Sequence, residues 1–284
     1  DRGETWSDHQ ILMDRDNDAG LMYVGMQFLN LDGELYAFTN QEHGTERPVD
    51  CILLSWDKCN RTWIEREPIA ERFLAMQQPI WMENGNFVMS GSYAAKPGQV
   101  NATVPVVYIS QGRQIEKPWR RVLMDTADYV NVFAETAVVV DGCNLLGVTR
   151  LENTPFPAFY ESNDYGESWR SIPNTTFAAS HSKFAAGTLS TGQRYIIYNL
   201  PKFQRDASGK ILVEGMNRAR HTLVMAVAEP GEKAFSRLWK ISDVTQATGQ
   251  KASHYPCAVE DRGMLCIIYT GQHDLRNCGF TRIP

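Results

Sequence analysis

Residues able to bind or attack an acidic group stand at the ends of apolar segments in the second half of the chain. They are Glu135, Arg150, Arg220 and Tyr255. An arginine guanidinium binds a carboxylate through two parallel hydrogen bonds and keeps its charge at any working pH. A glutamate among apolar neighbours such as Phe133 and Ala137 would have a raised pKa and could accept a proton, for example from a tyrosine hydroxyl. This combination predicts a site for a planar anion beside a proton acceptor.

Each of these residues also has an ordinary structural explanation. A lone glutamate before an apolar strand is usually a solvated or salt-bridged strand end, an arginine after a strand is usually a surface charge, and Tyr255 alone would be a packing residue. Their occurrence at matching points of three successive repeats favours a shared site. Arg218 is an alternative to Arg220, but Arg220 fits the register of its strand better.

The elements that position these residues are repeated strands and turns. One mark of the repeat is a tight-turn dipeptide between alternating apolar segments, ending in glycines 33, 85, 142, 192 and 263. The other is a tryptophan that closes a polar turn, at positions 6, 63, 119, 169 and 239. The two series have nearly the same spacing between successive positions, including a longer fourth interval. The segments around each glycine have the composition of β-hairpins.

Four short strands in each repeat predict the blades of a β-propeller. We expect an all-β fold that forms one domain over residues 1–284, with complete blades beginning near residues 22, 72, 131, 177 and 252. Residues 1–14 would supply only the outer strand of a first, incomplete blade, with the strand itself at Thr5 to Met13. The sequence thus predicts a six-bladed β-propeller with its first blade incomplete in this chain.

The turn motifs resemble those of a known family. Ser162-Asn-Asp164-Tyr-Gly166-Glu-Ser168-Trp169 has the form S-x-D-x-G-x-[ST]-W and resembles the Asp box (BNR repeat) of sialidases and related propellers. Asp1-Arg-Gly3-Glu-Thr5-Trp6 is the same box without its first two residues, and degenerate copies end at Trp63 and Trp119. The resemblance is to a bacterial branch of these propellers.

The resemblance implies a role for each of the four residues named first. Tyr255 would be the nucleophile and Glu135 its base, while Arg150 and Arg220 would bind the carboxylate of the substrate. The family's first arginine and its general-acid aspartate would lie upstream of Asp1. This chain departs from the family at Pro256-Cys257, where sialidases usually continue with Ser-Asp.

The resemblance implies a retaining exo-glycosidase that removes a terminal acidic sugar such as sialic acid from a glycan. Two alternatives stay open: a non-catalytic carbohydrate-binding propeller, and a glycosidase or lyase of the same fold that acts on another acidic glycan. Further residues are expected to line the central funnel, namely Tyr23, Gln77, Gln78, Lys183 and His254. Action on external glycans would imply a secreted or periplasmic protein, which we expect to be a monomer.

Composition excludes several other classes of protein. The chain has 284 residues with 28 Lys+Arg against 33 Asp+Glu, and no basic run longer than Arg120-Arg121, which disfavours a nucleic-acid partner. No apolar run reaches the length of a membrane span. The six cysteines lack metal-ligand spacing, so no metal or other cofactor is expected. Cys257 and Cys266 should face each other across a hairpin as free thiols.

Overall fold

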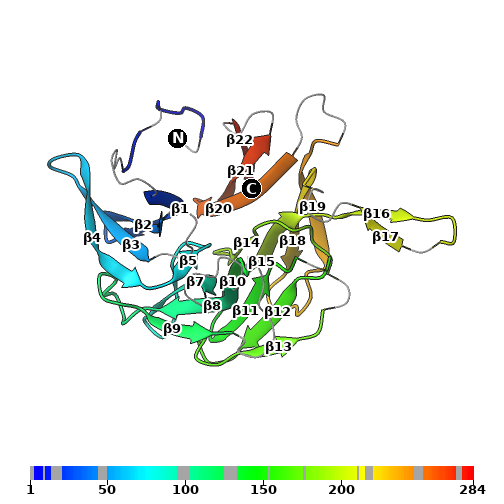
Figure 1. Cartoon of the computed structure of the whole chain (residues 1–284), viewed down its shortest axis with the longest axis horizontal. Coiled ribbons are helices and arrows are strands. Elements are labelled where there is room, and N and C mark those ends of the chain that lie inside the picture. Colours follow the sequence, from blue (N-terminus) through cyan, green and yellow to red (C-terminus); the bar gives the residue numbers. More distant parts are fainter. Residues whose placement is uncertain are drawn as a thin grey trace.

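The computed structural model describes residues 3–8, 10–13, 21–43, 50–94, 103–124, 133–152, 154–174, 177–209, 211–214, 220–245, 252–272 and 277–284. Within these ranges every regular element is a β-strand, as the repeat predicts. The strands form antiparallel sheets that follow one another around a common centre, which is the arrangement of a β-propeller (Figure 1).

Each sheet is traced outward from its innermost strand. The first contains β1 (Leu21–Leu31), β2 (Glu34–His43), β3 (Cys51–Asp57) and β4 (Thr62–Ala70). The second contains β5 (Phe73–Ala75), β6 (Ile80–Trp81), β7 (Phe87–Ala94), β8 (Thr103–Ile109) and β9 (Arg120–Leu123), with β5 and β6 both paired to β7. The third contains β10 (Thr136–Asp141), β11 (Asn144–Thr149), β12 (Ala158–Ser162) and β13 (Arg170–Ile172).

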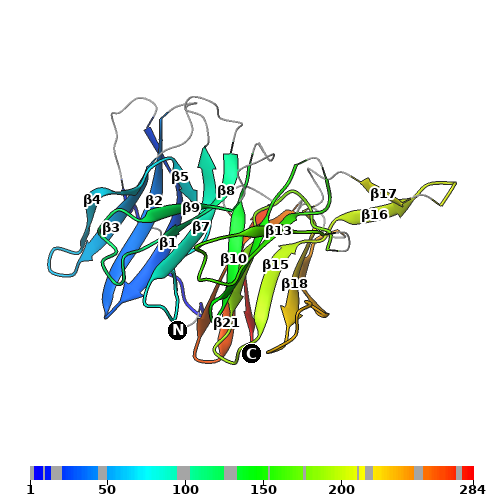
Figure 2. The same cartoon turned by 90° about the horizontal axis from the view of Figure 1, so that it is seen from below.

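The fourth sheet contains β14 (Ala185–Thr188), β15 (Arg194–Asn199), β18 (Thr222–Ala228) and β19 (Arg237–Asp243). The last contains β20 (Ala252–Asp261), β21 (Met264–Gln272) and β22 (Asn277–Ile283). Between β15 and β18 the chain forms a separate hairpin, β16 (Lys202–Arg205) with β17 (Ile211–Glu214), which projects away from the ring (Figure 2).

The prediction of six blades is wrong, because the described residues form five. The expected outer strand at Thr5 to Met13 is absent from the described part of that segment, which has no strand. Instead Trp6 packs edge-on against Phe280 of β22, and Glu4 pairs with Arg282 of the same strand at 3.1 Å. Met13 packs on the first sheet. Side chains of this segment therefore connect the last sheet to the first without a backbone ladder.

Tight turns form the hairpins at the dipeptides expected to do so. Asp32 and Gly33 both have positive φ, and so do Arg262 and Gly263, which suits the twist of a two-residue hairpin turn. Because the second turn is centred on Arg262 and Gly263, Cys257 pairs with Ile268 and Cys266 pairs with Val259. The expectation that the two cysteines face each other is therefore wrong by two positions, and both are free thiols.

Apolar clusters lie between successive sheets. Phe38, Phe73 and Tyr108 belong to a cluster shared by the first and second sheets. Similar clusters join the second sheet to the third, the third to the fourth and the fourth to the last. Burial of apolar area supplies most of the stabilisation, at about 25 cal/mol per Å², so each of the three middle blades is held by two neighbours.

Buried amide side chains add polar links between the inner strands. Gln77 donates through Nε2 to the carbonyls of Val138 (2.9 Å) and Ala186 (2.7 Å), and its Oε1 accepts from Ser90 Oγ and from Val138 N. Asn40 similarly reaches the backbone of Phe73 and Ala75. The Gln77 side chain thus connects the second, third and fourth sheets.

Replacing Gln77 with alanine is expected to lower the free energy of unfolding by about 2–3 kcal/mol, because it leaves buried backbone groups of β10 and β14 without partners. Urea unfolding followed by tryptophan fluorescence measures this change. The matched control is Gln78→Ala at the neighbouring, less buried position, which should cost less than about 0.5 kcal/mol. Equal losses in the two variants would contradict the linking role of Gln77.

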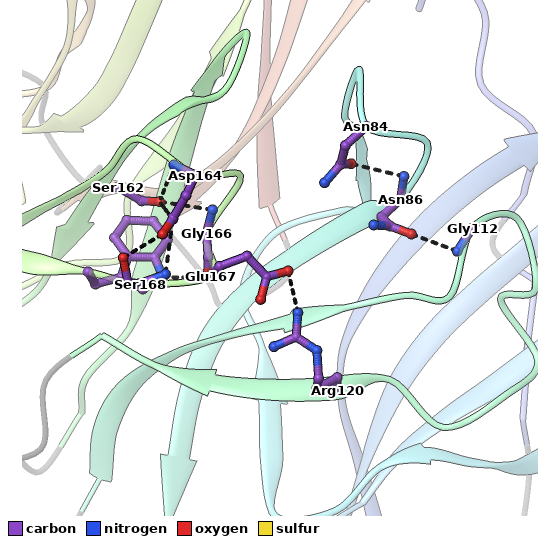
Figure 3. A network of polar contacts seen from close by, with 10 residues as sticks. Asn84, Asn86, Gly112, Arg120, Ser162, Asp164, Gly166, Glu167 and Ser168 are labelled. Atoms are coloured by element: carbon purple, nitrogen blue, oxygen red, sulfur yellow. Dashed lines mark hydrogen bonds and ion pairs between the residues drawn. The ribbon is translucent and has the colours of Figure 1, made fainter.

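The polar turn at residues 162–169 shows how an outer turn is fixed (Figure 3). Asp164 accepts from the backbone N–H and the hydroxyl of Ser168, while Gly166, at φ +84°, donates to Ser162 Oγ. Burial would raise the pKa of Asp164, but the hydrogen bonds from Ser168 and Ser162 outweigh it and hold the pKa below its usual value. Arg120 of the second sheet pairs with Glu167, which joins this turn to the neighbouring blade.

Candidate functional site

The residues expected to do chemistry lie at or near the ends of strands in the last three sheets. Glu135 immediately precedes β10 and Arg150 immediately follows β11. These two strands are antiparallel, with Thr136 opposite Thr149, so both residues lie at the same end of the third sheet. Arg220 lies just before β18, and its carbonyl accepts the N–H of Ser253 in β20. Tyr255 lies two residues further along β20, so Arg220 and Tyr255 also share one end of their sheets.

Glu135 and Arg150 form a nearly buried ion pair. Arg150 Nη1 lies 2.8 Å from Glu135 Oε2, and the two side chains are only 9% and 11% exposed. Arg150 Nη2 also lies 3.4 Å from Glu152 Oε1, and the guanidinium covers the ring of Phe133. The arginine therefore balances two carboxylates and is positioned on several sides, which favours one fixed geometry.

Arg220 and Tyr255 form a second cluster. Arg220 Nη1 lies 3.1 Å from Tyr255 Oη, and the guanidinium carbon lies 4.9 Å from the centre of the tyrosine ring. Two other nitrogens of Arg220, Nε and Nη2, donate to the backbone carbonyl of His181 at 3.2 and 2.7 Å. His181 thus fixes the arginine in the position from which it contacts Tyr255.

Tyr255 has an unusual backbone for a tyrosine. Its φ is +53°, and it sits in a β-bulge between His254 and Cys257. Its side chain is 39% exposed, whereas the neighbouring His254 is buried. A non-glycine residue held in the left-handed region costs of order 1–3 kcal/mol and is typical of functional sites. The bulge turns this side chain outward and leaves it accessible.

His254 is buried beside this pair and packs edge-on against the Tyr255 ring at 4.3 Å. Burial, together with the charge of Arg220, lowers the pKa of His254 from 6.5 to about 4. Its Nδ1 finds no hydrogen-bond partner in the protein as described. The imidazole is therefore neutral at physiological pH and adds no charge next to Arg220.

The lowered pKa makes stability depend on pH. Unfolded chains bind a proton at His254 below about pH 6.5, whereas the folded protein excludes it until about pH 4, so stability falls as pH decreases through this window. His254→Gln is expected to flatten the curve of unfolding free energy against pH between 6.5 and 4 by the contribution of about one proton. Urea unfolding at several pH values measures the slope. Parallel curves for wild type and variant would contradict this assignment.

The segment around His181 connects the two clusters. Its carbonyl accepts from Arg220, and its Nε2 lies 3.3 Å from the carbonyl of Thr154, in the loop that follows Arg150 and Glu152. No hydrogen bond joins Tyr255 directly to Glu135 in the described part of the chain, where Glu135 pairs with Arg150 and Tyr255 with Arg220. Tyr255, the nucleophile expected from the resemblance, is thus held by Arg220. Glu135, the expected base, is held by Arg150.

The residues expected to line the funnel have different surroundings. Gln77, Gln78 and Lys183 line a cavity of about 310 Å³ that also reaches Pro256 and Tyr195. Lys183 Nζ lies 3.4 Å from the carbonyl of Pro256, which follows Tyr255. Tyr23 is half-buried at the start of β1, against the apolar cluster of the first sheet. Arg218 lies outside the described residues.

A cationic cluster that we did not expect lies next to the Glu135 segment. Arg72 and Arg121 both place their guanidinium carbons within 5 Å of the centre of the Tyr93 ring. Ala134 donates to Thr103, which pairs with the residue that follows Tyr93. Arg72 precedes β5 directly, as Glu135 precedes β10, so alignment of the repeats would have found it. No feature of the sequence predicts the positive φ of 55° at Arg72.

The described residues contain no group of three or more His, Cys, Asp and Glu side chains that could hold a metal ion. None of the elements that the structure describes is a helix long and apolar enough to cross a membrane.

The described residues form a five-bladed β-propeller in which one arginine pairs with a glutamate and another with a tyrosine near the ends of strands. The chain belongs to the BNR repeat-like domain family, which it matches over residues 1–267. This agrees with the resemblance to sialidase-like propellers carried by the turn motifs. No curated protein matches the chain.

Solved structures with the same fold include glycosidases. The Hadza microbial sialidase Hz136 is 15% identical, with a TM-score of 0.68 over 99% of this chain and 57% of its own. The Trypanosoma rangeli sialidase in complex with sialic acid is 14% identical, with a TM-score of 0.62 over 99% and 47%. The Penicillium chrysogenum α-L-arabinanase complexed with arabinobiose is 15% identical, with a TM-score of 0.58 over 94% and 81%. This chain spans about half the length of the two sialidases.

Proposed function

We propose that this protein is a retaining exo-glycosidase that removes a terminal acidic sugar of the sialic acid type from glycans. The contact that carries the proposal is the one between Arg220 Nη1 and Tyr255 Oη, with Arg220 held by the carbonyl of His181. An arginine, a side chain suited to binding a carboxylate, thus lies next to an accessible hydroxyl. Fold similarity to two sialidases supports the same class of substrate.

The chemistry explains why a tyrosine suits this substrate. A sialoside carries a carboxylate on its anomeric carbon, which repels an anionic nucleophile but not a neutral hydroxyl. Oη of Tyr255 would attack the anomeric carbon while the bond to the leaving oxygen breaks, and Glu135 would accept the tyrosine proton. Water would then attack the anomeric carbon as its bond to Oη of Tyr255 breaks, and Glu135 would return the proton to that oxygen. The proton lost by water balances the leaving group that departed as an anion, and the two displacements restore the original configuration.

Binding of substrate must rearrange the ion pairs of the free protein. Arg150 already contacts Glu135 and Glu152, so a substrate carboxylate that binds Arg150 would compete with them. Such competition would release Glu135 toward Tyr255. Catalytic hydrogen bonds often form only in the complex with substrate, so their absence from the free protein is compatible with this mechanism.

The test is hydrolysis of 4-methylumbelliferyl α-N-acetylneuraminide, because its aryl leaving group departs without a strong general acid. We expect release of the fluorophore, and NMR should show the α-anomer of the free sugar as the first product. A first product of β configuration would contradict retention. Absence of hydrolysis of both this sialoside and aryl uronides would remove the glycosidase proposal.

A second candidate is a carbohydrate-binding propeller without turnover. The observation that favours it is the occupation of Arg150 by Glu135 and Glu152, with no bond between Glu135 and Tyr255 in the described residues. Binding of free N-acetylneuraminate in calorimetry without cleavage of the sialoside would identify this function. Cleavage of a uronide instead would identify a glycosidase for another acidic glycan. For each of these functions we propose a monomer that is secreted or periplasmic.

A further inference from the structure

A second cavity lies at the opposite end of the third and fourth sheets. Its volume is about 670 Å³, and its lining includes Asp141 at the end of β10, Asn144 at the start of β11 and Arg194 at the start of β15. Glu135 and Arg150 lie at the other ends of β10 and β11. A strand of six residues is about 17 Å long, so this cavity is separate from the candidate active site.

Arg194 is the unusual residue of this cavity. Its side chain is only 14% exposed, and its nearest carboxylate oxygen, Asp141 Oδ2, lies 3.4 Å from Nη1. The Nε and Nη2 atoms are buried and have no acceptor among the described residues. A guanidinium stays charged in proteins, and buried donors without acceptors are costly. Arg194 is thus a nearly buried cation whose hydrogen-bonding capacity is mostly unused.

Three carboxylates line the cavity with Arg194, and in the described part of the chain only the exposed Asp141 pairs with it. Glu161 pairs with Arg170, and Glu232 pairs with Arg237, so both carboxylates already have partners. Lys233, which also lines the cavity, has no ion-pair partner in the described part of the chain. Among the described residues, Arg194 therefore has unused hydrogen-bond donors, and Lys233 has an unpaired positive charge. Both features suit an anionic ligand.

The rest of the lining is apolar and aromatic. Leu146, Ile172 and Trp169 contribute to it, and the indole N–H of Trp169 is already bonded to the carbonyl of Gly166. The ring of Trp169 thus offers apolar surface rather than a donor. Ligand sites typically combine such surface with a few polar groups in a cavity of about 300–1,000 Å³.

We propose that this cavity is a second saccharide-binding site, distinct from the active site, that takes a carboxylate-bearing sugar. Arg194 and Lys233 bind the carboxylate, and the Trp169 ring packs against the C–H face of the sugar. Asp141 is the only carboxylate that pairs with Arg194 among the described residues, and it would repel the ligand. The site binds without cleaving and does not depend on Tyr255, so it extends the proposed function.

The test is calorimetric titration with trigalacturonate, with maltotriose as the neutral control. We expect the acidic trisaccharide to bind, with an affinity that falls as salt is added, and the neutral one not to bind. Arg194→Gln should weaken binding about tenfold or more, as expected for loss of a charge-assisted contact. Arg170→Gln is the matched control, because Arg170 lines the same cavity but is 77% exposed and paired with Glu161, and it should change the affinity less than twofold.

A second variant separates binding from structure. If Arg194 serves an external carboxylate, Asp141→Asn removes a competitor and should raise the affinity about threefold or more. If Arg194 only pairs with Asp141, the same variant gives no gain in affinity, and that result would overturn the proposal. Failure of wild type to bind trigalacturonate would also overturn it. Tyr255→Phe should leave this binding unchanged even if it abolishes hydrolysis, so failure of this proposal and failure of the proposed glycosidase are distinguishable.

Discussion

Replacement of Tyr255 by phenylalanine is expected to lower kcat on the aryl sialoside by about a thousandfold or more, with a much smaller change in KM. The variant removes the attacking oxygen, so the covalent route is lost while Arg220 can still bind the carboxylate. The ring, its packing against His254 and the exposed position in the bulge are retained. Steady-state kinetics on purified wild type and variant measure the effect.

The control for this variant is Tyr36→Phe in the first sheet, which should keep full activity and the same melting temperature. Mass spectrometry of rapidly quenched wild type should detect a sugar attached to the peptide that contains Tyr255, and none in the phenylalanine variant. Tyr255→Phe with full activity would exclude this residue as the nucleophile.

Replacement of Arg150 by methionine is expected to lower the free energy of unfolding by about 3–5 kcal/mol, because two largely buried carboxylates lose their cation. Glu135 is 11% exposed and Glu152 is 22% exposed in their side chains, so water replaces the arginine poorly. Activity on the sialoside should fall as well, since Arg150 is one of the two proposed carboxylate-binding groups. Urea unfolding gives the first quantity and kinetics the second.

A double variant identifies the cause of that loss. Arg150→Met combined with Glu135→Gln removes one of the uncompensated charges and should recover about 1–2 kcal/mol of stability without restoring activity. Arg170→Met is the matched control, since its side chain is 77% exposed and its ion pair with Glu161 should contribute less than about 1 kcal/mol. A double variant no more stable than Arg150→Met would show that packing, not charge, explains the loss.

The fold could be predicted from the sequence because its signals are local. Positive φ at Asp32, Gly33 and Gly263 follows from residue type, and each such turn fixes the pairing of the strands beside it. The number of blades could not be predicted in this way. It depends on whether Trp6 and Glu4 enter a backbone ladder or pack through their side chains on β22, and that choice is decided by contacts between the two ends of the chain.

The candidate site was predicted in part. Resemblance named Arg220 and Tyr255, and the structure places them in contact, but their roles stay predictions. A salt-bridged strand end was one explanation of Glu135, but its pairing with Arg150, and that of Arg150 with Glu152, were not predicted. These pairs depend on side-chain conformation and burial rather than on position in the repeat. The bulge at Tyr255 was also missed, since the sequence at Pro256-Cys257 signals only a departure from the family pattern.

The connection of the last sheet to the first through side chains affects how the molecule resists unfolding. A propeller whose two chain ends share one sheet is closed by backbone hydrogen bonds, and each of its blades then packs on two neighbours. In the described part of the chain, an aromatic contact and an exposed ion pair join the N-terminal segment to the last sheet, and the apolar clusters join only successive sheets. The five sheets therefore form a row with two ends. The third sheet, which carries Glu135 and Arg150, lies in the middle of that row. Tyr255 lies in the last sheet, at one end of the row. The surroundings of Tyr255 are therefore less protected against local unfolding than those of Glu135 and Arg150.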